Sequence, residues 1–331
     1  MIRSIEELTR HTGSPESARA EGRSLPALLN RRIAVEREFA RLGHTYRHGK
    51  IYRRFEHYVT RPALKVILKT TGLYGRGLRN AQSPVLREIS LEFPNLPVEL
   101  DKFQILHLSD FHIEGVPGLV DALAPLLAPL RPDVCVLTGD FRFEDYGPCE
   151  SVYPLMEALL ASVRPRLGIF GILGNHDTAE MALRMERIGV RMLINEAVPL
   201  GNHASPLWLI GVDDPFDYQC HDLERAQASV PSGDFKVLLA HAPEIYDEAA
   251  RSGIDLYLSG HTHGGQIRLP LVGAIRRNAR CPSTFAYGHW RYNRLQGYTS
   301  PGIGCSSLPV RFGCPPEIVL ITLRTAFPSR V

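Results

Sequence analysis

From Phe103 onward, short apolar runs alternate with stretches of helical periodicity, and this alternation is the feature that most restricts the fold. Runs of four to six apolar residues bounded by turn residues are typical of buried strands. The expected strands are Gln104–Ser109, Val134–Thr138, Gly168–Leu173, Arg191–Asn195, Leu207–Val212, Lys236–Ala240, Asp255–Ser259 and Glu317–Thr322. The expected helices are Pro117–Leu130, Val152–Ser162, Thr178–Ile188, His221–Ser229 and Pro243–Ser252. Strands that alternate with helices predict an α/β domain.

Composition and length fit a folded protein. The chain has 331 residues, 44% hydrophobic and 22% charged, which supports a sizeable core and excludes disorder throughout. No apolar run is long enough for a transmembrane helix, and residues 1–19 lack the apolar centre of a secretory signal. The six cysteines show no paired spacing and are interpreted as reduced thiols. These features predict a cytoplasmic protein.

The first 100 residues differ from the rest in charge. Residues 31–80 carry 13 lysines and arginines against three acidic residues, a net charge of +10, so the remainder carries −7 of the total of +3. Expected elements in the N-terminal part are helices over Leu28–Leu42 and Ile51–Leu68, and one or two strands within Pro84–Leu100. We therefore expect a basic, mostly helical extension over residues 1–100 and the α/β domain over residues 101–331.

Aromatic residues alternate with the basic ones in this segment: Phe39, Tyr46, Tyr52, Phe55 and Tyr58. Interfacial helices often have this composition, so we expect residues 31–80 to make a peripheral contact with the inner face of a membrane. The alternative is that these helices pack on the body with solvated arginines. The same charge would attract nucleic acid, but no base-reading module is present, so no specific nucleic-acid partner is predicted. The oligomeric state is not predicted.

Ligand-type side chains follow five of the expected strands. They are Asp110, His112, Asp140, Asn175, His176, His241, His261 and His263. In open α/β sheets the loops at the carboxyl ends of the strands converge on one crevice. Imidazole nitrogens together with carboxylate and amide oxygens suit Mn, Fe, Zn, Co or Ni ions, and there are about enough ligands here for two ions. Two such ions can clamp the attacking and leaving oxygens of a phosphoryl transfer.

The segments LSDFHIEG, LTGDF, LGNHD, LLAHAPE and LSGHTHGGQ resemble, in order and spacing, the signature motifs of the calcineurin-like metallophosphoesterases. The resemblance covers roughly residues 103–325. It implies a fold of two facing mixed β-sheets flanked by helices, an α/β/β/α sandwich, here with an N-terminal helical extension. It also implies a hydrolase of phosphate esters or phosphoanhydrides that uses two divalent or trivalent metal ions. Manganese is the first expectation, with Fe, Zn, Co or Ni as alternatives.

The resemblance assigns roles residue by residue. It implies that one metal is held by Asp110, His112 and His263, that the other is held by Asn175, His241 and His261, and that Asp140 bridges the two. A metal-bridging hydroxide would attack phosphorus in line. His176 would act on the substrate phosphate or leaving oxygen, and Asp177 would orient its imidazole ring.

The sequence departs from the family at one point. The common pattern after the bridging aspartate is GDxxD, but Phe143 occupies the place of the second acid, and Glu144 or Asp145 is a candidate substitute. Arg142 is a candidate substrate residue, because it is a guanidinium beside a metal ligand. Arg311 is another, with a loop-bracing role as the equal alternative. His107 alternates with the buried side of its strand and is expected to be structural.

The ending GHTHGGQ and the late segment GIGCSSLPVRFG resemble a bacterial subgroup that includes UDP-2,3-diacylglucosamine pyrophosphatases. This favours a phosphodiesterase or pyrophosphatase acting on a lipid-linked or nucleotide substrate, so the expected partner is a phosphorylated small molecule or lipid. The alternatives are a phosphomonoesterase or protein phosphatase with the same metal site, and a non-catalytic scaffold. A scaffold would be free to lose ligands, whereas every expected ligand type is present.

Overall fold

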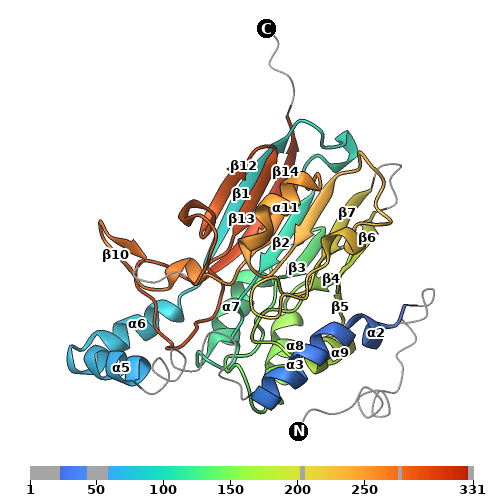
Figure 1. Ribbon diagram of the computed structural model, residues 1–331. Coiled ribbons are helices and arrows are strands. Elements are labelled where there is room, and N and C mark those ends of the chain that lie inside the picture. Colours follow the sequence, from blue (N-terminus) through green and yellow to red (C-terminus); the bar gives the residue numbers. More distant parts are fainter. Residues whose placement is uncertain (1–22, 43–58, 202–205, 275–277, 327–331) are drawn as a thin grey trace.

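Two six-stranded mixed sheets face each other in the computed structural model, which describes residues 23–42, 59–201, 206–274 and 278–326 (Figure 1). The first sheet has the order β1 (Val85–Phe93), β14 (Glu317–Thr325), β2 (Gln104–Leu108), β3 (Val134–Leu137), β4 (Ile169–Gly171), β5 (Val190–Met192). The second has the order β12 (Gly288–Tyr292), β13 (Leu295–Thr299), β9 (Leu256–Ser259), β8 (Lys236–Leu239), β7 (Leu207–Gly211), β6 (Glu196–Leu200). Apolar side chains from both sheets form one core between them.

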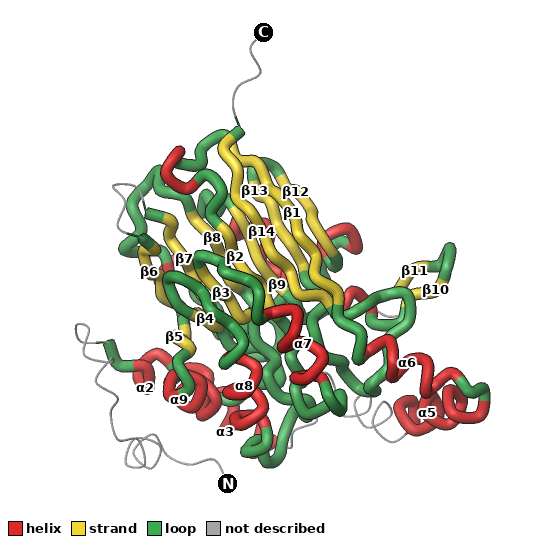
Figure 2. Tube along the Cα trace, turned by 180° about the vertical axis from the view of Figure 1, so that it is seen from behind, coloured by secondary structure: helices red, strands yellow, loops and turns green. Residues whose placement is uncertain are grey.

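Helices pack against the outer face of each sheet, and Figure 2 shows those of the first sheet near one end of its strands. The first sheet packs against α7 (Leu119–Leu127), α8 (Val152–Leu160) and α9 (Ala179–Arg187), and the second against α10 (Leu223–Ala226) and α11 (Tyr246–Arg251). Strand β2 shows how the layers arise: Leu106 faces the helices, whereas Ile105 faces the core between the sheets. Successive side chains of a strand point to opposite faces, so a run of apolar residues serves both cores. The expected α/β fold with two facing sheets is confirmed.

The N-terminal helices lie in two places. Helices α2 (Leu25–Leu28) and α3 (Asn30–Leu42) pack against the helical layer of the first sheet, while α5 (Arg61–Thr70) and α6 (Leu73–Ala81) lie at the opposite side of the molecule (Figure 1). The first part of the helix expected over Ile51–Leu68 lies outside the described residues. None of the helices in the described residues combines the length and apolar character that crossing a bilayer requires.

Strand β1 joins the N-terminal part of the chain to the first sheet. It pairs in parallel with β14 over nine residues, from Val85 beside Glu317 to Phe93 beside Thr325. Residues 85–93, which the sequence places in the extension before residue 100, therefore belong to the sheet. The partner strand lies more than 200 residues later in the chain, and such a pairing has no local signal.

His107 is buried between the sheets, as expected of a structural residue, and its Nε2 lies 2.9 Å from Thr138 Oγ1. Burial lowers the pKa of His107 from 6.5 to about 3. The unfolded chain therefore binds a proton below pH 6.5 that the folded chain does not bind until about pH 3. Stability should fall as the pH drops through this window.

We expect His107→Gln to flatten this acid dependence, because glutamine can bond Thr138 but does not titrate. The slope of unfolding free energy against pH should decrease by about 1.4 kcal/mol per pH unit. Urea unfolding of metal-free protein at a series of pH values measures the slope. His289→Gln, at an exposed histidine, is the control for the substitution itself. Equal slopes for wild type and His107→Gln would contradict the prediction.

Candidate metal centre

The loops after five strands bring the ligand-type side chains to one place at the edge shared by the two sheets. Strands β2, β3 and β4 of the first sheet and β8 and β9 of the second each end immediately before such a loop. All the expected metal ligands are buried: Asp110, His112, Asp140, Asn175, His241, His261 and His263. The structure therefore brings together residues that are up to 153 positions apart, from Asp110 to His263.

The first group consists of Asp110, His112 and His263. The Nε2 atoms of His112 and His263 lie 3.1 Å apart, and His263 Nε2 lies 3.4 Å from Asp110 Oδ1. His112 Nδ1 donates to the carbonyl of Arg142 at 2.8 Å, which leaves a lone pair on Nε2. Burial, then His176, lowers the pKa of His112, which favours this neutral ring.

The second group contains Asn175, His241 and His261. Asn175 Oδ1 lies 3.0 Å from His241 Nε2 and 2.7 Å from His261 Nδ1. Asp140 lies between the groups, since its Oδ2 is 3.3 Å from His241 Nε2 and 3.6 Å from His112 Nε2. This is the position that a bridging carboxylate needs.

The electrostatics of the cluster fit bound cations. Burial opposes a charge on His241, yet Asp140, Asp110 and Asp214 raise its pKa to about 10. The buried carboxylates thus favour a positive charge at this point. Nitrogen and oxygen atoms of the cluster also lie only 3.1 to 3.6 Å from one another. Such a donor set suits cations bound between its members. The residues present therefore fit divalent metal ions.

Unusual backbone conformations aim these side chains inward. Five residues of the cluster have positive φ: Asp110 (49°), His112 (37°), Asp140 (57°), His261 (70°) and His263 (51°). Non-glycine residues rarely adopt this region, and it concentrates at functional sites where surrounding contacts hold it. Here the amides of Asp110 and His112 donate to the carbonyls of Gly139 and Asp140. The strain is thus supported by hydrogen bonds between neighbouring loops.

The loop after β13 supports Asp110, a role that sequence reasoning missed. Ile303 N donates to Ser109 O at 3.0 Å, and Gly304 N donates to Asp110 O at 2.8 Å. Gly302 has φ +76°, and a Cβ atom there would lie 2.5 Å from the Cβ of Asp110. The closely spaced glycines in the SPGIG segment were the only local signal of this close approach.

Known proteins with similar sequences include phosphoesterases, which agrees with a metal site at this position. Residues 103–265 match the family model of the calcineurin-like phosphoesterases. The phosphodiesterase YaeI of Escherichia coli K12 is 30% identical over 230 residues, which cover 67% of this chain and 82% of that protein. The chain belongs to the calcineurin-like phosphoesterase family. It is a metal-dependent phosphoester hydrolase.

The chain is also similar to two other proteins. A bovine transmembrane protein with a metallophosphoesterase domain is 32% identical over 288 residues, which cover 80% of this phosphoesterase but 63% of the bovine protein. A 5′-nucleotidase precursor from Thermus thermophilus aligns with a TM-score of 0.40 and 14% identity, over 66% of this chain and 54% of that chain.

His176 lies at the centre of the phosphoesterase site, but the acid beside it differs from the expectation. Its Nε2 lies 3.9 Å from Asp140 Oδ2, and its Nδ1 lies 2.9 Å from the carbonyl of Phe143 and 3.1 Å from Asp145 Oδ1. The expected orientation of His176 by Asp177 is wrong, because the Asp177 carboxylate accepts hydrogen bonds from three backbone amides. These belong to Asp140, Phe141 and Gly174, each at 2.8 Å.

Asp177 therefore joins the loops that carry Asp140 and Asn175, and Asp145 is the residue that pairs with the His176 ring. Of the two substitutes considered from the sequence for the missing acid of the GDxxD pattern, Asp145 is the one that contacts this ring. A carboxylate that bonds one ring nitrogen orients the other toward the reaction site.

Loop carbonyls hold both candidate substrate arginines, and Arg311 also contacts the cluster, with its Nη2 3.5 Å from His263 Nδ1. Arg142 is buried and donates to the carbonyls of His176, Asp145 and Gly147, so its expected role toward the substrate is not supported. Arg311 is also buried, and it donates to the carbonyls of Gly304, Pro301, Gly302 and Cys314. Both guanidinium groups brace loops, which was the alternative stated for Arg311.

We expect Asp145→Asn to lower kcat about 10- to 100-fold, the usual cost of losing a carboxylate that orients a functional histidine. Steady-state kinetics on bis-p-nitrophenyl phosphate measures this loss. The exposed neighbour Glu144 is the matched control, and Glu144→Gln should behave as wild type. Identical effects of both variants would contradict the assignment.

Arg32 of helix α3 reaches the metal-site loop from the N-terminal part of the chain. It is fully buried and donates to the carbonyls of Gly174 and Asp177 at 2.6 and 2.7 Å. It also forms an ion pair with Asp213, and its guanidinium lies 3.8 Å from the centre of the Tyr218 ring. The loop that presents Asn175 and His176 is therefore held by a residue outside the matched family segment.

Proposed function

We propose that this phosphoesterase hydrolyses a phosphodiester or a phosphoanhydride with two metal ions. Asp110, His112 and His263 would hold one ion, and Asn175, His241 and His261 the other, with Asp140 shared. When bound, the ions would supply Lewis-acid stabilisation of the phosphate charge and a nucleophile at neutral pH. Mn is the first expectation, because oxygen and imidazole ligands are mixed in both groups, and Fe, Zn, Co or Ni also suit them.

His176 would act on the substrate itself. Its Nδ1 is held by the Phe143 carbonyl and by Asp145, so its Nε2 is directed toward Asp140 and the cluster. A ring held in this way can donate a proton to the leaving oxygen or a hydrogen bond to a phosphate oxygen. His176 is 8% exposed, so it keeps a small contact with solvent.

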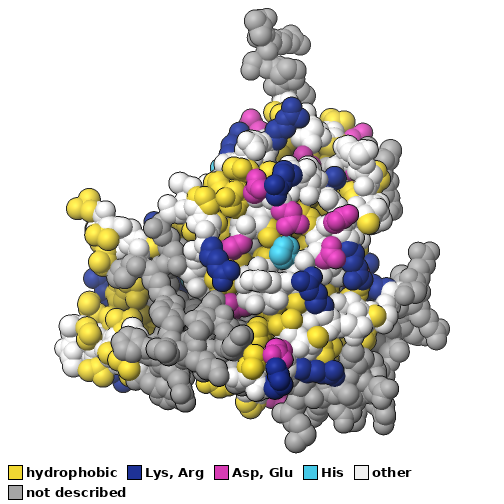
Figure 3. Space-filling view, in the orientation of Figure 1, with side chains coloured by type: hydrophobic (Ala, Val, Ile, Leu, Met, Phe, Trp, Pro, Cys, Tyr) yellow, Lys and Arg dark blue, Asp and Glu magenta, His cyan; other side chains and the backbone are white. Residues whose placement is uncertain are grey.

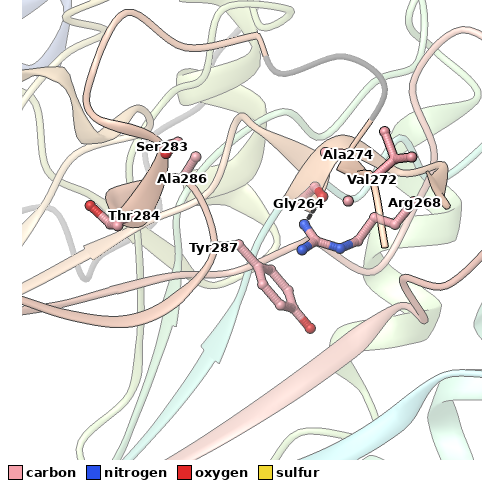
Figure 4. A pocket seen from close by; sticks show the side chains of 9 residues that line it. Gly264, Arg268, Val272, Ala274, Ser283, Thr284, Ala286 and Tyr287 are labelled. Atoms are coloured by element: carbon pink, nitrogen blue, oxygen red, sulfur yellow. Dashed lines mark hydrogen bonds between the residues drawn. The ribbon is translucent and has the colours of Figure 1, made fainter. Parts of the chain in front are cut away.

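A cavity beside the cluster is the observation that favours a substrate with two substituents on phosphorus. It measures about 220 Å³ and begins at Gly264, the residue after His263 (Figure 4). Arg268 and Tyr287 line it, and the Arg268 guanidinium lies 5.0 Å from the Tyr287 ring centre and donates to the carbonyl of Gly264 at 2.9 Å. A cavity with an arginine next to a phosphate site suits a second ester group or a second phosphate. A diester has a second substituent that could lie there, whereas a phosphomonoester has only its leaving group.

Hydrolysis of matched substrates by Mn-loaded protein tests the proposal. We expect kcat/KM for bis-p-nitrophenyl phosphate to exceed that for p-nitrophenyl phosphate at least about tenfold, a difference of about 1.4 kcal/mol in transition-state binding. UDP-diacylglucosamine, a nucleotide-linked lipid pyrophosphate, tests the finer expectation from the sequence. Arg268→Ala should raise KM for the diester more than for the monoester. A preference for the monoester would instead establish a phosphomonoesterase.

A further inference from the structure

A protruding surface next to the cavity is formed by helices α5 and α6 together with the hairpin of β10 (Arg268–Leu269) and β11 (Gly273–Ala274). The two parts are joined by a small apolar cluster in which Leu68 of α5 packs with Leu308 and Val310, and Ile267 beside β10 packs against the same cluster. Figures 1 and 2 both show the hairpin and the helix pair on the same side of the molecule, away from α3.

Large apolar side chains on this surface are exposed to solvent. On the hairpin, Leu271 is fully exposed and Val272 is 73% exposed, and on α5 Val66 and Ile67 are more than half exposed. Leu73 and Leu269 extend the set. We call these six residues the docking surface. In Figure 3, apolar side chains gather over the hairpin and over α5. A group of large apolar side chains exposed on one side of a protein marks an interaction site.

The stretches of sequence that form the docking surface carry charge of one sign. Between Glu56 and Glu88 the sequence has no acidic residue, while Lys65 and Lys69 on α5 are exposed beside Val66 and Ile67. The hairpin lies within the stretch between Asp255 and Glu317, which also has no acidic residue. Exposed apolar residues flanked by positive charge match the chemistry of an anionic lipid surface, where the apolar groups enter the interface and the cations meet the headgroups.

We propose that the docking surface binds the surface of an anionic bilayer. Of the segment expected from the sequence over residues 31–80, this site contains only Val66, Ile67 and Leu73. The α3 part of that segment packs on the body, where the Phe39 ring lies 5.4 Å from that of Tyr218, and residues 43–58 lie outside the described residues. Because Val272 and Gly264 line the same cavity, docking would place the cavity mouth near the bilayer. Binding itself does not depend on the proposed reaction.

Co-sedimentation with phosphatidylcholine vesicles, with and without phosphatidylglycerol, tests the proposal. We expect the full-length protein to bind the anionic vesicles, less so at high salt, and to bind pure phosphatidylcholine at least about tenfold more weakly, as the loss of several lysine and arginine contacts implies. The double variants Leu271→Glu/Val272→Glu and Val66→Glu/Ile67→Glu should each weaken binding at least about tenfold. Lys65→Gln and Lys69→Gln should each weaken it about fivefold.

Val98→Glu is the matched control, because Val98 is 67% exposed and lies outside the docking surface. It should bind as wild type, and both Val98→Glu and Val66→Glu/Ile67→Glu should retain hydrolysis of soluble bis-p-nitrophenyl phosphate, which shows that they are folded. Equal losses for Val98→Glu and the hairpin variant, or no binding of the wild type, would overturn the proposal. Light scattering that shows a dimer dissociated by the same variants would also overturn it, and would make this surface a contact between two copies.

Discussion

Asp140→Asn is expected to lower kcat for diester hydrolysis about a thousandfold or more, which corresponds to about 4 kcal/mol of transition-state stabilisation. Asp140 Oδ2 lies within 3.6 Å of ring nitrogens from both ligand groups, at His241 and His112. An amide keeps the shape of the carboxylate but removes its negative charge, so both groups lose their shared ligand. Metal analysis should show a lower metal content, and steady-state kinetics should show the loss of kcat.

The fold should survive this change. Burial opposes ionisation of Asp140, although His241, His176 and His112 lower its pKa, so neutralising the side chain removes a buried charge. Asp121→Asn, at an exposed position on α7, is the control for the chemistry of the substitution and should keep full activity. Retention of both metal content and turnover by Asp140→Asn would refute the two-metal assignment.

Arg32→Met is expected to destabilise the protein by about 3 to 5 kcal/mol, since it leaves Asp213 buried without its partner. The same change removes the hydrogen bonds to the carbonyls of Gly174 and Asp177. The loop that carries Asn175 and His176 should then lose its position, and kcat should fall even where the protein remains folded. Urea unfolding measures the first effect, and kinetics at low temperature measures the second.

A double-mutant cycle with Asp213→Asn separates the ion pair from the loop contacts. If the ion pair dominates, Arg32→Met in the Asp213→Asn background should cost much less stability than in the wild type. The loss of kcat should persist in the double variant, because the carbonyls of residues 174 and 177 still lack their donor. Arg41→Met, at an exposed position on the same helix, should change neither quantity. Independent, additive effects on stability would contradict a buried pair.

The sequence predicted the strands that precede the metal-type residues, because their apolar runs are short, continuous and bounded by turns. It missed helix α6, which contains Gly75 and Gly77, since glycine lowers helix propensity. Packing decides here: a Cβ atom at Gly77 would lie 2.8 Å from Val310 and Phe312, so only glycine lets the helix approach that loop. The strands β12 and β13 were missed because their polar and aromatic residues lack a clear alternation.

The acid that contacts His176 could not be predicted from the sequence, for a different reason. Asp177 is adjacent in sequence, but its side chain turns toward the backbone amides of Asp140, Phe141 and Gly174. Asp145 is 31 positions away and meets the ring only because the loop after β3 folds over it. Adjacency along the chain does not fix the direction of a side chain in a turn, so the pairing could not be inferred from the motif.

The sequence by itself determined the α/β class, the family and the set of residues with metal-ligand chemistry. The apolar runs, turn residues and ligand residue types that indicate them each lie within a short segment of the chain. Only the tertiary structure decided that β1 joins the first sheet, that Arg32 holds the loop of Asn175 and His176, and that Asp145 pairs with His176. These contacts join segments distant in the chain. Their energy comes from burial and charge pairing that exist only after the chain has folded.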